Sequence, residues 1–90
     1  MTDISIYKGY TVLTIDPNLK YKIRITKTKA KIIVKNLDRM KKFITDTENH
    51  ATDMKFLEIH NNLESHNLTY YYCKRVIEHQ ADLIAFLNNN

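Results

Sequence analysis

The sequence predicts a small α+β domain in which a three-stranded antiparallel β-meander comes first and two to three helices pack on one face of it. Residues 4–35 alternate apolar and polar side chains with the period of a strand. Residues 37–87 place apolar side chains three and four positions apart, as a helix does. Strands followed by helices favour segregated layers. The length of 90 residues fits one domain, residues 1–90, around one core.

The first predicted strand covers residues 4–15. Tyr10 is expected on its inward side, and Leu13 and Ile15 on its outward side. Gly9 interrupts the pattern, so either a bulge or a break into a short strand and a main strand is expected there. Asp16-Pro17-Asn18 then predicts a turn, because proline fixes φ at the second position and its neighbours suit the flanking positions.

The next two predicted strands, residues 20–26 and 30–35, lie in the stretch KYKIRITKTKAKIIVK. Their apolar side chains share one face if Ile25 lies opposite Ile32. A shift of this register by one residue would expose all the apolar side chains of one strand to solvent. This register leaves four residues as the connecting loop, because the stretch lacks the Asn-Gly type of pair that tight hairpins prefer. Tyr21 is then expected to point inward with the isoleucines.

Helices are predicted for the remainder of the chain. The first follows an N-cap at Asn36, and residues 45–50 are polar and predict a loop. A second helix is expected from Thr52 or Asp53 to about Leu63, with His60 on its apolar side as a core residue.

The final helix is predicted over residues 69–87, after a short turn at 65–67, and gives the clearest helical pattern of the chain. It is expected to lie antiparallel to the helix before it. Its apolar stripe allows two interpretations that the sequence leaves open: full burial against the sheet and the preceding helix, or pairing with a second copy in a homodimer.

Charge is distributed unevenly along the chain. Residues 1–45, the basic hairpin half, carry eleven basic and three acidic side chains, a formal charge of +8. Residues 46–90, the acidic helical half, carry three basic and seven acidic side chains, a formal charge of −4. This asymmetry indicates either two surfaces of opposite sign or a self-complementary contact.

The predicted second hairpin would display a basic face. Such a face could bind phosphates, since each neutralised phosphate releases counterions, or it could be a solvated face whose lysines protect an exposed edge. Tyr10 and Tyr21 are expected to point inward, which counts against base stacking on this face. The cations predicted to project from it are Lys20, Lys22, Arg24, Lys31 and Lys35.

The stretch TYYYCKR, residues 69–75, is the second candidate binding segment. Successive residues of a helix point 100° apart, so at least one of the three tyrosines faces solvent, and Tyr70 or Tyr71 is the stronger candidate. Exposed tyrosine beside Lys74 and Arg75 is typical of protein interfaces, although packing of the tyrosines against the sheet is the alternative.

Other classes of function lack a motif. One glycine excludes a glycine-rich phosphate loop, and four histidines at least six residues apart with one cysteine give no zinc-ligand spacing. We therefore expect no enzyme, no cofactor and no metal. No apolar run reaches the ~18 residues of a membrane span, and the N-terminus does not resemble a signal peptide. The expected location is the cytoplasm, that of the host cell if the protein is viral, without membrane contact.

Short length, an asparagine- and lysine-rich composition typical of AT-rich genomes, and a small α+β layout without an active-site motif resemble bacteriophage accessory proteins, such as host-takeover factors and anti-CRISPR inhibitors. The resemblance implies a small non-enzymatic binding protein that docks on and blocks a host protein or nucleoprotein complex. The alternative is a nucleic-acid-binding domain that uses the basic face. The predicted binding residues are Lys20, Lys22, Arg24, Lys31, Lys35, Tyr70, Tyr71, Lys74 and Arg75.

Overall fold

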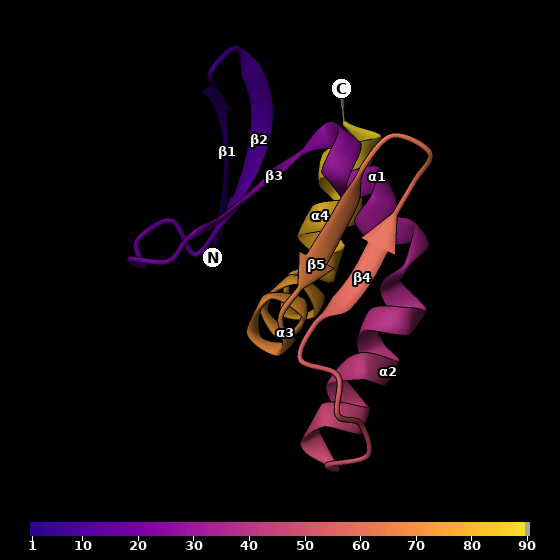
Figure 1. The fold of residues 1–90 in the computed structure, drawn as a ribbon. Helices are drawn as coiled ribbons and strands as arrows, with labels where there is room; N and C mark the ends of the chain where they lie inside the picture. Colours follow the sequence, from indigo (N-terminus) through magenta and orange to yellow (C-terminus); the bar gives the residue numbers. More distant parts are fainter. Residues whose placement is uncertain (90) are drawn as a thin grey trace.

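The computed structural model describes residues 1–89 and confirms the α+β class, with a three-stranded antiparallel sheet followed by helices (Figure 1). The described residues also form a separate two-stranded sheet. The elements are β1 (Thr2–Tyr7), β2 (Tyr10–Ile15), β3 (Ile23–Thr26), α1 (Lys27–Lys35), α2 (Leu37–Glu48), β4 (Leu57–His60), β5 (Ser65–Leu68), α3 (Tyr70–Glu78) and α4 (Gln80–Asn88).

The first predicted strand is two strands joined by a tight turn. Lys8 and Gly9 have φ angles of 52° and 82°, and Tyr7 lies opposite Tyr10. Positive φ at both central residues is the geometry of a type I′ hairpin, which glycine adopts without strain. The break anticipated at Gly9 is therefore confirmed, and it places Tyr7 and Tyr10 side by side at the end of a hairpin.

The order β1-β2-β3 makes β2 the central strand and corrects its predicted orientation. Leu13 lies opposite Ile25 and Ile15 opposite Ile23, so these four side chains share one face and are buried. Leu13 and Ile15 were expected to face outward. That expectation was wrong because the register of β2 with β3 aligns Leu13 and Ile15 with Ile25 and Ile23, the side chains of β3 that the core buries. We call the opposite side of this sheet, which carries Tyr7, Tyr10 and Arg24, the outer face.

The strand predicted at residues 30–35 is wrong, because this segment is helix α1. The Thr26 side chain caps it by accepting a hydrogen bond from the Lys29 N–H at 3.3 Å. Ala30 and Ile33 are buried at helical spacing, and the Lys27 ammonium binds the backbone carbonyl of Phe86 in α4. A cation at the C-terminal end of a helix satisfies its free carbonyls, so contacts with α4 favour the helix over a strand.

Helix α2 confirms the predicted helix after Asn36 and extends it through most of the expected loop to Glu48. Met40 and Phe43 are its buried residues. Asn36 lies at the N-cap position but makes no side-chain capping bond there, and its amide donates to the Ile32 carbonyl at 2.7 Å instead. Asn36 therefore closes the end of α1 as α2 begins.

The helix predicted from Thr52 is wrong, because residues 57–60 and 65–68 form the hairpin of β4 and β5. Leu57 and Ile59 are buried while the intervening side chains are exposed, which is the period of a half-buried strand. His60 is exposed at the end of β4 and is not the core residue that was expected. Asn61 turns the chain by accepting the N–H groups of Leu63 and Glu64 at 2.8 and 2.9 Å.

The final helix is confirmed, but it is divided at His79 into α3 and α4. The Thr69 side chain caps α3 by accepting the Tyr72 N–H at 3.1 Å. Since the preceding segment is β5, the predicted antiparallel pair of terminal helices does not form, and α3 packs against α2 instead. No helix within residues 1–89 is long and apolar enough to cross a bilayer.

The core contains buried side chains from every element of residues 1–89 except β1. Figure 1 shows the reason: the β1–β2 hairpin projects away from the helices, and only the end of β2 next to β3 reaches them. The core residues are Leu13, Ile15, Ile23, Ile25, Ala30, Ile32, Ile33, Met40, Phe43, Leu57, Ile59, Leu68, Cys73, Val76, Leu83 and Phe86.

Candidate functional site

The two segments singled out from the sequence meet in a groove between the chain before β3 and the start of α3. One hollow of about 360 Å³ contains Lys22 and Arg24 from the first segment and Tyr71 and Arg75 from the second. An adjoining hollow of about 540 Å³ shares Tyr21, Tyr71 and Arg75 with the first. We call the two hollows together the tyrosine groove. Its lining residues are Leu19, Lys20, Tyr21, Lys22, Ile23, Arg24, Thr69, Tyr71, Tyr72 and Arg75.

Arg75 has a structural role at the base of this groove. Its Nε donates to Asp16 Oδ2 at 3.1 Å and one terminal nitrogen donates to the Tyr21 carbonyl at 2.6 Å. The other terminal nitrogen lies 3.5 Å from the Ile15 carbonyl. Arg75 thus connects α3 to the loop between β2 and β3, and its charge is already neutralised by Asp16.

The Asp16 carboxylate lies beside three nitrogen groups, from the N-terminus, α3 and the residue that ends α3. It lies 3.5 Å from the Met1 ammonium and 3.7 Å from His79 Nε2, in addition to Arg75. Desolvation of the carboxyl acts to raise the pKa of Asp16. The hydrogen bond from Arg75 and the surrounding charges outweigh it, so the pKa lies below its ordinary value of 3.8. This ionised carboxylate fixes the turn at which the groove begins.

Tyr70 and Lys74 are also held by an internal acid. The Tyr70 hydroxyl donates to Glu48 Oε2 at 2.6 Å, and the Lys74 ammonium donates to the same oxygen at 3.1 Å. The hydrogen bond from Tyr70, followed by that from Lys74, lowers the pKa of Glu48. Contacts with Tyr70 and Glu48 raise the pKa of Lys74. These two predicted binding residues therefore join α3 to α2.

Tyr71 differs from its two neighbours because 74% of its surface is exposed. Tyr72 turns into the protein, where burial raises the pKa of its phenol, and Lys29 lies 4.6 Å from its ring centroid. The sequence expectation that one of Tyr70 and Tyr71 faces solvent is confirmed for Tyr71. Tyr21, expected inward, is 75% exposed on the other wall of the groove.

The outer face of the three-stranded sheet continues the groove. Arg24 lines the groove, and its guanidinium carbon also lies 4.7 Å from the centroid of the Tyr7 ring. Lys8 Nζ lies 5.4 Å from the same centroid. Tyr10, opposite Tyr7, is 67% exposed. The expectation that Tyr10 points inward was wrong, because Tyr10 lies on the outer face, on the side of β2 opposite to the buried Leu13 and Ile15.

We call this combined region the tyrosine–cation surface. It consists of exposed tyrosines and of cations that form no ion pair within residues 1–89, and Arg24 joins its two parts. Its members are Tyr7, Tyr10, Tyr21, Tyr71, Lys8, Lys20, Lys22 and Arg24.

Lys31 and Lys35 do not belong to a basic sheet face. Both are exposed on α1, four residues apart and therefore on the same side of that helix. The predicted five-cation face thus divides into a cluster of Lys20, Lys22 and Arg24 and a separate helical pair.

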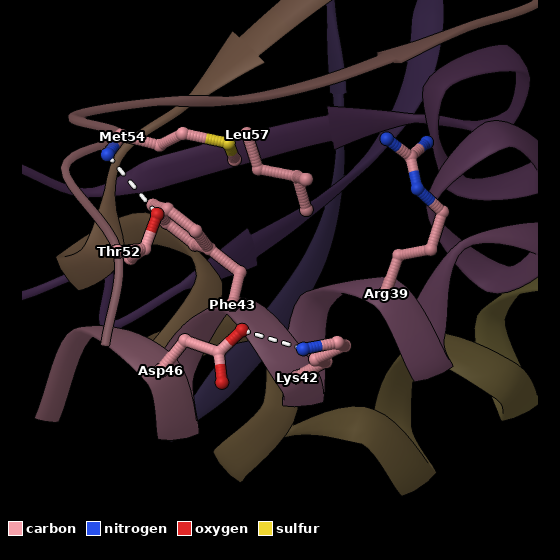
Figure 2. Close-up of a pocket in the computed structure, with 7 residues that line it drawn as sticks. All are labelled: Arg39, Lys42, Phe43, Asp46, Thr52, Met54 and Leu57. Carbon is pink, nitrogen blue, oxygen red and sulfur yellow. Dashed lines mark hydrogen bonds and ion pairs between the residues drawn. The ribbon is translucent and has the colours of Figure 1, made fainter. Parts of the chain in front are cut away.

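A separate hollow, of about 300 Å³, lies between α2 and the loop before β4 (Figure 2). Phe43, Met54 and Leu57 form its apolar walls, and Lys42 is paired with Asp46 at 2.7 Å. The sequence did not indicate this hollow, because its loop wall was expected to be helical. Lys42 and Asp46 neutralise each other, whereas Arg39 donates to Asn36 Oδ1 at 3.0 Å.

The described residues offer little for metal or thiol chemistry. Within residues 1–89 no group of three or more His, Cys, Asp or Glu side chains is placed to hold a metal ion. Cys73 is fully buried, and burial raises the pKa of its thiol to about 11. A nucleophilic cysteine needs a thiolate near neutral pH, so this thiol is structural.

No known protein family matches the chain, and neither a curated protein nor a solved structure is similar enough to indicate what it binds. The tyrosine–cation surface is therefore interpreted from its own chemistry.

Proposed function

We propose that the protein binds single-stranded nucleic acid on the tyrosine–cation surface. The observation that carries this proposal is the alternation of exposed tyrosine rings with unpaired cations, from Tyr10 and Tyr7 through Arg24 to the tyrosine groove. The proposed role needs neither a cofactor nor a catalytic group.

The physical argument concerns the two parts of a nucleotide. Bases stack on aromatic side chains, at about 1–3 kcal/mol per stacked base, and all four bases can do so. Phosphates are neutralised by lysine and arginine. Tyr7 and Tyr10 are directly opposite on neighbouring strands, so they form one platform, while Tyr21 and Tyr71 form another across the groove. Such a surface favours single strands, because bases in a duplex are already stacked.

The division of the cations supports the same surface. Arg75 and Lys74 are neutralised by Asp16 and Glu48, whereas Lys20, Lys22 and Arg24 surround the exposed tyrosines without an acidic partner in the described residues. Four available cations, with Lys8 included, predict a slope of about −3 for log affinity against log salt on a single strand.

The test is fluorescence anisotropy with a labelled oligo-dT or oligo-U of roughly 16 nucleotides at ~50 mM salt. Tyr71→Ala and Tyr10→Ala should each weaken binding about 5- to 150-fold, while the corresponding Phe variants should bind nearly as well as the unmodified protein. Lys41→Ala is the matched control, because Lys41 is an exposed cation on α2 away from this surface. Absence of binding to either oligonucleotide at ~50 mM salt would contradict the proposal.

A second candidate function is docking on a host protein, as an inhibitor would. The observation that favours it is the larger hollow of the groove, where Leu19, Tyr21 and Tyr71 expose apolar surface beside Arg75. An apolar contact of this kind should depend little on salt. Salt-insensitive capture of one partner that is lost in Tyr71→Ala but retained in Lys41→Ala, together with no affinity for oligonucleotides, would favour docking over nucleic-acid binding.

A further inference from the structure

Strand β1 has apolar side chains but no place in the core. Ile4 and Ile6 are 55% and 78% exposed, although Ile4 shares its face with buried Leu13 and Ile25. The hairpin projects beyond the helices, so nothing within residues 1–89 covers these two isoleucines (Figure 1). A two-stranded hairpin with an uncovered apolar face is only marginally stable in water. Burial of Ile4 and Ile6 against a further strand would therefore stabilise it.

The outer edge of β1 also has free backbone groups. The Asp16 N–H donates to the Met1 carbonyl at 2.8 Å, which makes Met1 and Asp16 a hydrogen-bonded pair. Hydrogen-bonded and non-hydrogen-bonded pairs alternate along an antiparallel ladder. The N–H and C=O groups of Ile4 and Ile6 must consequently point away from β2. Within residues 1–89 no strand pairs with this edge.

The usual protection of an edge strand is lacking along β1. Its pairing with β2 is continuous over residues 2–7 without a bulge, and that stretch contains neither lysine nor proline. Edges without such features readily pair with another strand.

We propose that β1 pairs with β1 of a second copy of the chain, in antiparallel orientation about a two-fold axis, so that two three-stranded sheets become one six-stranded sheet. The sequence of the strand carries the choice of partner. Asp3-Ile4-Ser5-Ile6-Tyr7 alternates polar and apolar side chains on both sides of Ser5, so it can match its own reverse in an isologous interface, where residue i contacts residue j and j contacts i. Pairing Ser5 with Ser5 of the second copy places Ile4 opposite Ile6 in both directions.

This register satisfies two independent requirements. The four isoleucines of the two copies come together on one face, and the pairs that they form are those whose N–H and C=O groups point outward. A shift of the pairing by two residues would place Ile6 opposite either Thr2 or Ile6 of the second copy. In both cases the four isoleucines would no longer pair with one another.

The charges are complementary as well. In this register Asp3 of one copy lies opposite Tyr7 of the other. The Tyr7 ring has Lys8 Nζ at 5.4 Å and the Arg24 guanidinium at 4.7 Å from its centroid. Each Asp3 would therefore face a tyrosine ring with two cations around it, and this opposite charge favours pairing with a second copy.

The dimer would extend the binding surface, a consequence that rests on the proposed function. A two-fold axis perpendicular to the sheet keeps both outer faces on the same side. The Tyr7–Tyr10 pairs of the two copies would then lie on one face of the six-stranded sheet, one pair at each end of the new interface, so the dimer would offer two aromatic platforms where one copy offers one. The dimer itself depends only on β1 and not on any ligand.

The experiment is sedimentation equilibrium of the full chain without nucleic acid. One strand per copy buries an area at the low end for specific complexes, so a dissociation constant in the ~micromolar range is expected, with the mass rising from 10.7 kDa toward twice that value. Ile6→Lys should raise the dissociation constant at least about tenfold, because lysine on an edge opposes strand pairing. Leu63→Lys is the matched control: Leu63 is 89% exposed in the turn between β4 and β5, and its replacement should leave the constant unchanged.

A backbone variant makes the test independent of side-chain burial. Ile4→Pro removes an N–H that points away from β2, so the hairpin should keep its fold while the dimer is lost. A mass of one chain at all concentrations would overturn the proposal, and so would a dimer that persists in both Ile6→Lys and Ile4→Pro. Because no oligonucleotide is present, failure here is distinguishable from failure of the proposed function.

Discussion

Replacement of Arg75 by alanine should destabilise the protein and disorder the groove together. The change removes an ion pair to Asp16 at 3.1 Å and a hydrogen bond to the Tyr21 carbonyl at 2.6 Å, and both charged side chains are about three-quarters covered. A hydrogen bond to a charged group contributes about 1.5–3 kcal/mol. Removal of the guanidinium also leaves the Asp16 carboxylate with only its longer contacts, to the Met1 ammonium at 3.5 Å and to His79 Nε2 at 3.7 Å. We expect a loss of about 2–3 kcal/mol in the free energy of unfolding, which is roughly 10–20 °C in Tm for a domain of this size.

The assay is urea denaturation followed by circular dichroism at pH 7, beside Arg75→Lys and Lys41→Ala. Lysine can reach one of the acceptors but lacks the planar fork, so Arg75→Lys should recover only part of the loss. Lys41→Ala should change the free energy by less than ~0.5 kcal/mol, as most exposed substitutions do. A loss below ~0.5 kcal/mol in Arg75→Ala would refute the view that this residue joins α3 to the loop between β2 and β3.

The other predictions concern acid stability, the helix that replaces a predicted strand, the core and the thiol. Because the folded pKa of Asp16 lies below its unfolded value, its contribution is present above about pH 4 and is lost as the pH falls further, so Asp16→Asn should flatten the decline of Tm below the ordinary pKa of 3.8; an unchanged acid profile would contradict this. Thr26→Ala should cost about 1 kcal/mol by removing the cap of α1, measured by urea denaturation, whereas a strand at this position would show no such loss. Phe86→Ala should cost about 3–5 kcal/mol, since Phe86 is almost fully buried, and a cost below ~1 kcal/mol would place α4 outside the core. Cys73 should react with a thiol reagent at pH 8 only after unfolding, because its pKa is raised to about 11, and rapid reaction of the native protein would show that the thiol is accessible.

Elements whose pattern agrees with their local signals could be predicted from the sequence. The correctly predicted elements are those in which the apolar period and the residues at the boundaries indicate the same structure. They are the turn at Asp16 to Asn18, the strand that ends at Thr26, the helix after Asn36 and the helical region from residue 69. The two wrong predictions are the strand at residues 30–35 and the helix from Thr52. Both are short apolar runs that fit the period of a strand as well as the period of a helix. Ile32 and Ile33 follow an alternating stretch, and the Thr26 cap together with the contacts with α4 favours the helix.

The candidate site was predictable in its composition but not in its orientation. The basic segment before β3 and the tyrosines of α3 were recognised separately, and their meeting depends on a long-range contact between Arg75 and Asp16. The sequence pattern predicts Tyr10 and Tyr21 inward, but the core face of β2 is the side of Leu13 and Ile15, and Tyr21 lies before β3 begins at Ile23. Tyr7 and Tyr10 flank the Lys8-Gly9 turn directly, and this spacing is the sequence signal that indicates a paired, exposed set of aromatic side chains.

The most direct test of the tyrosine–cation surface is an NMR titration of the isotopically labelled chain with oligo-dT. Binding as proposed predicts shift changes and ring-proton broadening at Tyr7, Tyr10, Tyr21 and Tyr71, with the amide of Lys41 unaffected. Changes confined to α2 and the loop before β4, or no change at a saturating amount of oligonucleotide, would contradict it.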